Sequence, residues 1–184
     1  MLKLTGSQEI KGFGPPAVFE AGARAESLPQ LGSLALTVLG KEEKLKKDTE
    51  IGVVFNFPTN FPGFSLPDEI KTVVTECEPG KLMRIEGVSE DETLAVMLLL
   101  ELQKFQKGIG TEISHTLELD YRASRLKALK LKAAEFALRI PIELEVREFS
   151  KQHVANILTY LDAAPAAASK SKKQLDPTLK SVAA

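Results

Sequence analysis

The sequence predicts an α+β fold in which a curved antiparallel sheet wraps around one long C-terminal helix. The stretch from Arg122 to Asp162 is the longest run with helical periodicity, and it follows every strand-like segment. The segments before it alternate apolar and polar residues and are joined by short turns, which is typical of an antiparallel meander. A sheet with one apolar face and one solvated face is suited to packing against a helix.

The expected helix carries two sets of apolar residues at steps of three and four. The first set is Leu126, Leu129, Ala133, Phe136, Ile140 and Leu144, and the second is Leu131, Ala134, Leu138, Ile142, Val146, Phe149, His153, Ile157 and Leu161. We interpret them as adjacent stripes that form one wide apolar face, as expected of a helix buried against a sheet. Pro141 lacks an N–H, so we expect a kink or a restart there.

The elements before the helix are predicted in order along the chain. Residues 2–10 alternate as a half-exposed strand, Pro15-Pro16 suits the first turn of a helix, and a short helical turn is expected over Glu26–Leu31. Further strands are expected over residues 34–39, 51–57, 69–78, 81–87, 93–105 and 111–121. The last strand places Thr111, Ile113, His115, Leu117, Leu119 and Tyr121 on one face and its acidic residues on the other.

The segment from Phe57 to Pro67 is expected to be an irregular surface loop. It contains the prolines Pro58, Pro62 and Pro67 and the apolar residues Phe61, Phe64 and Leu66. The prolines interrupt every window in which regular structure could form, whereas the apolar side chains would be costly to leave in water as one patch. We therefore expect the loop to cap the open end of a cavity and to act as its gate.

Length and composition restrict the class of protein. The chain of 184 residues is expected to form one domain over residues 1–162 and a disordered tail over residues 163–184, and a formal charge of -1 gives no pull toward nucleic acid. The single cysteine, Cys77, excludes an internal disulfide framework, and two histidines far apart in the sequence argue against a metal site.

The N-terminus lacks the apolar core of a signal peptide, and no apolar run reaches the roughly 18–20 residues of a membrane span. We therefore expect a cytoplasmic protein.

His115 lies on the apolar face of its expected strand. Two interpretations stay open: a core histidine bonded to a neighbour, or a polar anchor for a ligand whose near-neutral pKa also permits proton transfer. His153 is expected to pack within the helix stripe, and Cys77 to be a small structural thiol. The spacing Gly12-x-Gly14-x-x-Ala17 matches a dinucleotide fingerprint in letters, but the alternating strand before it and the two prolines within it argue against a phosphate site.

The start of the long helix is basic. Arg122, Arg125, Lys127, Lys130 and Lys132 follow one another without an acidic interruption. We favour a solvated helix face for them. The functional alternative is peripheral contact with an anionic membrane, to which the lysines of the tail would add.

Residues 14–19 followed by 27–29 form a proline-opened entry to a pair of helices, and residues 74–82 form a strand that ends in a Pro-Gly turn. In these stretches the chain resembles the polyketide cyclase/dehydrase and lipid-transport group of the START-like, or SRPBCC, superfamily. The hairpin at Gly110-Thr111 and residues 154–158 also fit. The resemblance covers residues 1–162 and implies a helix-grip fold. The chain departs from the group in having no tryptophan, with Met83 and Ile85 following the Pro-Gly turn where members often carry an aromatic residue.

The resemblance implies a hydrophobic cavity between sheet and helix that holds a lipid, sterol, polyketide or quinone-like ligand. The geometry favours the same function, because a curved sheet and one helix seldom fill the space between them. The residues expected to line or gate the cavity are Phe55, Phe57, Phe61, Phe64, Ile85, Leu98, Ile113, His115, Leu117, Phe136 and Ile140. We expect neither a cofactor nor a metal.

Two other functions stay open. One is a polyketide cyclase or dehydratase with His115 as acid–base residue, which needs a second polar group, such as Tyr121 or Arg84, within hydrogen-bond reach. The other is a protein-interaction module that uses the Phe-rich loop and has a filled core. A cavity large enough for a ligand would favour the first two functions, and a solid core would favour the third.

Overall fold

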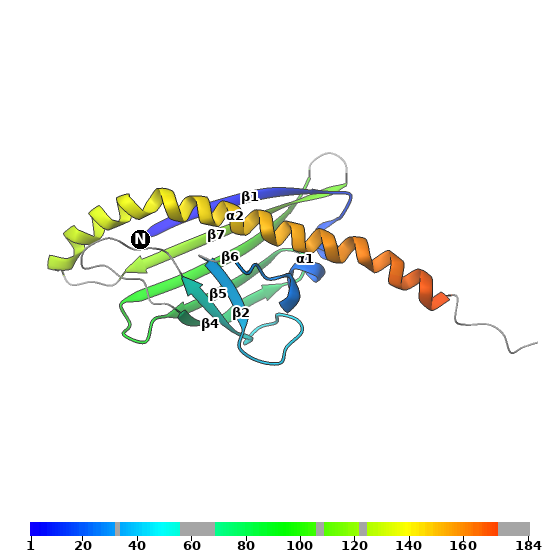
Figure 1. Cartoon of the computed structure of the whole chain (residues 1–184), viewed down its shortest axis with the longest axis horizontal. Helices are drawn as coiled ribbons and strands as arrows, with labels where there is room; N and C mark the ends of the chain where they lie inside the picture. Colours follow the sequence, from blue (N-terminus) through cyan, green and yellow to red (C-terminus); the bar gives the residue numbers. More distant parts are fainter. Residues whose placement is uncertain (32–33, 56–68, 106–108, 122–124, 173–184) are drawn as a thin grey trace, which may run out of the picture.

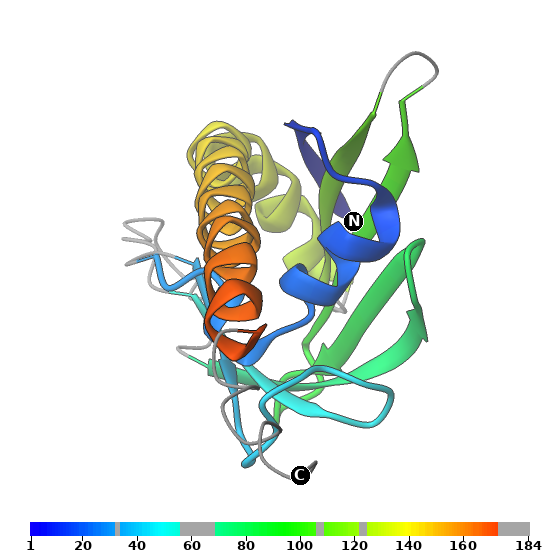
Figure 2. The same cartoon turned by 90° about the vertical axis from the view of Figure 1, so that its right-hand side faces the viewer.

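The computed structural model describes residues 1–31, 34–55, 69–105, 109–121 and 125–172, and within the last range the side chains of residues 139–140 and 142–163. The fold is α+β, as predicted, because a seven-stranded antiparallel sheet curls around a long C-terminal helix (Figure 1). This arrangement is a helix-grip fold. Figure 2 shows the helix nearly end-on, with the sheet curving around one side of it.

The elements and their pairing match the predicted meander. In chain order they are β1 (Leu2–Lys11), α1 (Pro15–Gly22), the 3-10 turn η1 (Ala25–Ser27), β2 (Leu34–Val38), β3 (Glu50–Phe55), β4 (Glu69–Glu78), β5 (Leu82–Val88), β6 (Leu94–Lys104), β7 (Gly110–Tyr121) and α2 (Arg125–Lys172). The spatial order is β1-β7-β6-β5-β4-β3-β2. The strands from β2 to β7 therefore form a meander, and β1 pairs with β7. The predicted strands are confirmed within the described residues, and residues 56–57 of the third predicted strand lie outside them. The turn expected over Glu26–Leu31 is a shorter 3-10 turn.

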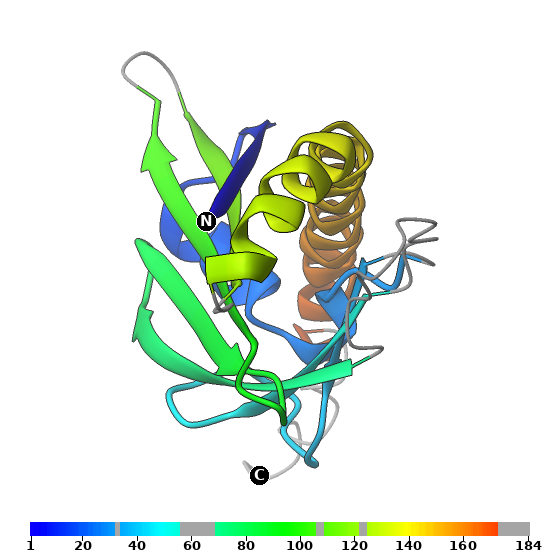
Figure 3. The ribbon, with the colours of Figure 1, turned by 90° about the vertical axis from the view of Figure 1, so that its left-hand side faces the viewer.

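Helix α2 is continuous from Arg125 to Lys172, so it passes Pro141 without a restart. Its first part, yellow-green in Figure 3, lies at an angle to the rest. The helix also runs past Asp162, where we expected it to end, into the first part of the expected tail. Residues 173–184 lie outside the described residues.

Where the structure describes their side chains, the two apolar sets of α2 lie on opposite sides of the helix, so the prediction of one wide apolar face is wrong there. Each residue turns an α-helix by about 100°, so Ile140 and Ile142 lie about 200° apart. Ile142, like the other described apolar residues of its set, is buried. Ile140 and Leu144, from the other set, are 68% and 57% exposed. The structure therefore also corrects the placement of Ile140 in the cavity lining.

Two glycines allow α2 to lie close to the rest of the fold. A Cβ atom on Gly6 in β1 would lie 3.1 Å from the carbonyl oxygen of Val146 and 3.3 Å from the Cβ atom of Ser150. A Cβ atom on Gly22, at the end of α1, would lie 3.0 Å from the Cδ1 atom of Ile157. Side chains larger than hydrogen at these positions would push the helix away from β1 and α1.

The C-terminal half of α2 is also attached to the α1–η1 segment by polar contacts. The Asn156 side-chain amide donates to the Ser27 carbonyl group at 3.1 Å. Arg24 donates to the Tyr160 hydroxyl at 3.2 Å, and its guanidinium lies 4.6 Å from the centre of the same ring. These contacts position α2 along its axis, at the end of the sheet that α1 covers.

We predict that Gly6→Ala destabilises the protein by about 1–3 kcal/mol, because the new methyl group overpacks the contact between β1 and α2. Urea denaturation would measure the change. Gly40→Ala is the matched control, since a Cβ atom there would meet only the flexible carboxylate end of Glu42, and we expect a change within about 0.5 kcal/mol. Equal effects of the two substitutions would contradict the close packing at Gly6.

Candidate functional site

The inner face of the sheet, which is turned toward α2, carries a row of paired apolar residues. Leu4 pairs with Leu117, Leu117 with Leu98, Leu98 with Ile85, and Ile85 with Val74. Paired residues of antiparallel strands lie on the same face, and all five side chains are buried. The row therefore forms a continuous apolar surface across β1, β7, β6, β5 and β4.

The predicted lining residues divide into three groups. Phe55, Ile85, Leu98, Ile113, His115 and Leu117 are buried, with side chains on the inner face. Phe57, Phe61 and Phe64 lie outside the described residues, as does the side chain of Phe136. Ile140 is exposed on the outer side of α2. The gate that we expected over residues 57–67 also lies outside the described part of the chain.

His115 is the centre of a buried chain of hydrogen bonds that connects four elements. Its Nδ1 atom lies 2.9 Å from the Ser150 hydroxyl, and its Nε2 atom lies 2.7 Å from Nδ1 of His153, with both partners on α2. The Nε2 atom of His153 lies 3.1 Å from the carbonyl oxygen of Gly22 in α1. In the sheet, His115 pairs with Gly6 of β1, which leaves room for Ser150 beside the imidazole. We call these side chains the Ser150–His115–His153 network.

The partners fix the tautomer of each imidazole. The carbonyl oxygen of Gly22 can only accept, so His153 must carry its proton on Nε2 and accept at Nδ1. His115 must then donate from Nε2 and accept at Nδ1, and the Ser150 hydroxyl must donate to it. In neutral form, both rings therefore use both nitrogen atoms.

Burial keeps both histidines neutral. It lowers the pKa of His153 to about 4, against a smaller opposing effect of the hydrogen bond to Gly22. Burial and the nearby charge of His153 hold the pKa of His115 well below its usual value. The ring of Phe149 packs edge-on against His115, with 5.5 Å between ring centres, and adds to the low polarity of the site.

A hydroxyl bonded to an imidazole that a third group orients is an arrangement that nucleophilic catalysis uses, but this network is not accessible. Ser150, His115 and His153 are 0%, 1% and 2% exposed, so the hydroxyl and the rings face protein atoms. Nucleophilic attack needs a substrate in contact with the hydroxyl. The arrangement shown here therefore holds α2 in place, and the interpretation of His115 as a bonded core histidine accounts for every contact of its ring.

Other polar side chains of the inner face are also paired within the protein. The Thr72 hydroxyl donates to the carbonyl oxygen of Ile51 at 2.7 Å, and the Thr111 hydroxyl donates to that of Phe13 at 2.9 Å. Arg84 lies on the opposite face of its strand, 3.4 Å from Glu76, and so does not supply a second polar group beside His115. Among the described residues, no cluster of three or more possible ligands could hold a metal ion.

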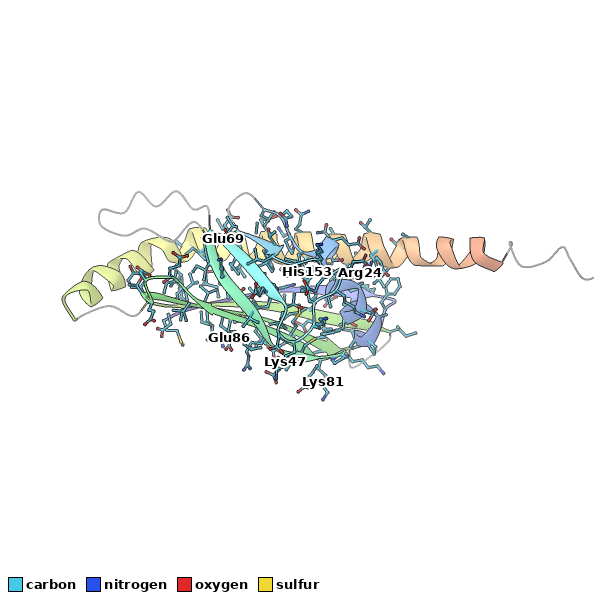
Figure 4. All side chains as sticks on the ribbon, turned by 90° about the horizontal axis from the view of Figure 1, so that it is seen from below. Arg24, Lys47, Glu69, Lys81, Glu86 and His153 are labelled. Carbon is cyan, nitrogen blue, oxygen red and sulfur yellow. The ribbon has the colours of Figure 1, made fainter. Side chains whose placement is uncertain are left out.

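A groove of about 330 Å³ lies on the outer face of the sheet, away from His115. It is lined by Met1, Glu86, Gly87, Val88, Ala95, Val96, Met97, Glu118 and Asp120. Figure 4 shows Glu86 on the side of the sheet opposite to α2. Glu118 already pairs with Lys3 at 2.6 Å, and Asp120 lies 3.9 Å from the amino group of Met1. We therefore place the candidate site on the inner face.

Sequence reasoning missed Ser150, Gly6 and Gly22. One signal was present for Ser150, because it lies three residues before His153 and so beside it on the helix surface. No signal in the sequence connects Gly6 or Gly22 to either histidine. Their role depends on the close approach of α2, which is a property of the folded chain.

No protein-family model matches the sequence, and no curated protein matches it. Several solved structures share the fold. The protein of unknown function SA2116 from Staphylococcus aureus is 12% identical with a TM-score of 0.53, over 87% of this chain and 96% of that chain. Protein NE0264 from Nitrosomonas europaea is 12% identical with a TM-score of 0.52, over 90% and 97%. Protein Ms6760 from Mycobacterium smegmatis is 16% identical with a TM-score of 0.50, over 89% and 92%. At these identities the likeness shows the fold alone.

We predict that acid destabilises the protein through the two histidines. Below about pH 6.5 the unfolded chain binds protons that the folded chain excludes, so the free energy of unfolding falls by about 1.4 kcal/mol per pH unit for each histidine. The loss continues down to the folded pKa, which is about 4 for His153. Above about pH 6.5 both states are neutral and the effect vanishes. Urea denaturation across this range would measure it.

The matched control is the double substitution His115→Gln/His153→Gln. A glutamine amide offers one acceptor and one donor, so it can replace the neutral imidazole in both hydrogen bonds but does not titrate. We expect the variant to lack the additional pH dependence. The same pH dependence in parent and variant would show that the histidines are not the cause.

Proposed function

We propose that the protein binds a small hydrophobic molecule between the inner face of the sheet and α2. The observation that carries this proposal is the continuous apolar row from Leu4 to Val74, which crosses five strands on the face turned toward the helix. The helix-grip architecture supports it, since the sheet curves around the helix and ligand sites are concave and mostly apolar (Figure 2).

The hydrogen bonds of the inner face favour a ligand held by apolar contact. His115, Thr72 and Thr111 donate or accept within the protein. A ligand that needed one of these groups would have to break an existing hydrogen bond, which costs about 1–3 kcal/mol for a buried group left unpaired. A lipid, a sterol, or the apolar part of a polyketide or quinone needs no such group.

The same observations make the enzymatic alternative less favourable. A cyclase or dehydratase would need His115 to exchange a proton with its substrate. Both ring nitrogens of His115 have protein partners, and Arg84 lies on the other face of the sheet. The protein-interaction alternative depends on the Phe-rich loop, which lies outside the described residues.

A second candidate function, contact with an anionic membrane, is favoured by the outer side of α2. Ile140 and Leu144 are exposed there, and they continue the apolar set that begins at Leu126. The same part of the chain carries the basic residues Arg122, Arg125, Lys127, Lys130, Lys132 and Arg139 and the acidic residue Glu135. None of the described helices is both long and apolar enough to cross a membrane. The contact that we propose is peripheral.

For ligand binding, we predict that the neutral probe N-phenyl-1-naphthylamine binds saturably and that Leu98→Phe weakens its binding roughly tenfold. Leu98 lies in the middle of the apolar row, so a larger ring there would enter the ligand's space. Val88→Phe is the control, because Val88 is exposed on the outer face. Fluorescence titration would give both affinities, and native mass spectrometry of the purified parent would reveal a bound molecule.

A filled interior would give the opposite results. The parent would bind no probe and carry no additional mass. Leu98→Phe would also lower the free energy of unfolding by about 1–3 kcal/mol, because the ring would overpack a core without space for it.

For membrane contact, we predict that the protein sediments with vesicles of phosphatidylcholine and phosphatidylserine and not with phosphatidylcholine alone. Ile140→Ser/Leu144→Ser should weaken this binding roughly tenfold or more, because two apolar side chains no longer enter the interface. Ile109→Ser is the matched control, since Ile109 is 73% exposed in the turn between β6 and β7. Equal binding by parent and double variant would reject contact through α2.

A further inference from the structure

The Ser150–His115–His153 network attaches α2 to β1, β7 and α1. Within the described residues, no backbone hydrogen bond joins the helix to these elements. His115 belongs to β7, Ser150 and His153 belong to α2, and the carbonyl groups of Gly6 and Gly22 belong to β1 and α1. The strands are joined by their own backbone hydrogen bonds, which do not use these side chains. A change in the network would therefore act on the helix first and on the sheet second.

The network can accept one additional proton without losing a hydrogen bond. If Nδ1 of His115 is protonated, it becomes a donor and the Ser150 hydroxyl must accept from it. The hydroxyl can then turn its own proton toward the carbonyl oxygen of Gly6, which lies 3.4 Å away. The hydrogen bonds from His115 to His153 and from His153 to Gly22 keep their direction.

A second proton cannot bind without the loss of a hydrogen bond. It would have to bind Nδ1 of His153, where the N–H would point at the N–H of His115 across 2.7 Å. Two imidazolium rings at this distance also repel each other in a site of low polarity. Because one ring is on β7 and the other is on α2, the rings can separate only if the helix moves away from the sheet.

No other titratable group relieves this repulsion in the described part of the structure. The groups that face the two rings are Gly6 from β1, Leu100 from β6, Gly22 from α1, and Phe149 and Ser150 from α2. None of them is a carboxylate. A buried pair of positive charges without a counter-ion is strongly destabilising.

We propose that the Ser150–His115–His153 network is an acid-sensitive latch, which holds α2 on the sheet in neutral solution and releases it when both histidines are protonated. Release exposes the apolar inner face while the strands stay paired. If the proposed function holds, release would also empty the ligand site. That consequence rests on the proposed function, whereas the latch itself does not.

Hydrogen–deuterium exchange of the full chain, without ligand, tests the latch. Between about pH 7 and about pH 5, after correction for intrinsic exchange, amides of residues 142–161 in α2 should lose protection by up to about a hundredfold per pH unit, because opening takes up as many as two protons. Amides of β5 and β6 exchange only through global unfolding, so they should stay much better protected than those of α2 at every pH. Equal protection of helix and sheet would mean that α2 opens only by global unfolding and would overturn the proposal, as would an unchanged α2.

His115→Gln/His153→Gln serves as the control, since the chain contains only two histidines and the variant has none. The protection of its α2 should be the same at both pH values, and an acid-induced loss equal to that of the parent would overturn the proposal. If the variant does not fold, nuclear magnetic resonance of the parent decides. Exchange detects rare openings, so both rings should stay neutral in the closed majority while α2 loses protection. Protonation of both rings with α2 still fully protected would overturn the latch.

Discussion

The hydrogen bond between His115 and His153 determines where α2 lies on the sheet. It joins the inner face of β7 to the buried side of the helix at 2.7 Å, and Ser150 and Gly22 extend it to a chain that ends on α1. Burial of apolar surface would hold a helix on this sheet in many positions, because the hydrophobic effect has no direction. The network selects one position, because each hydrogen bond requires its own donor and acceptor.

The same network limits the chemistry of the inner face. The polar groups of the network bond to one another and to α1, and they hold the helix. The surface beside them is a continuous row of leucine, isoleucine and valine side chains. If the proposed ligand binds there, its recognition would depend on its shape and apolar area. The helix has a second apolar side, at Ile140 and Leu144, which faces away from the sheet. The helix thus presents apolar side chains to the interior on one side and to solvent on the other.

The strands could be predicted because their apolar residues follow a local period. The network could not, because no local pattern connects residues that are distant in the sequence. In β7 the alternation from Thr111 to Tyr121 placed His115 on the inner face before its partners were known. Those partners, Ser150 and His153, are 35 and 38 residues away, and no local pattern brings them to His115. The opposed stripes of α2 were predictable, because the angle between Ile140 and Ile142 follows from helix geometry alone.

Two neutral histidines, each with its proton on Nε2, hold α2 in place. Nitrogen-15 magnetic resonance of the imidazole rings at neutral pH measures the tautomer of each ring directly. We expect a protonated Nε2 and an unprotonated Nδ1 on both His115 and His153. A proton on Nδ1 of either ring, or an imidazolium at neutral pH, would contradict this assignment of donors and acceptors.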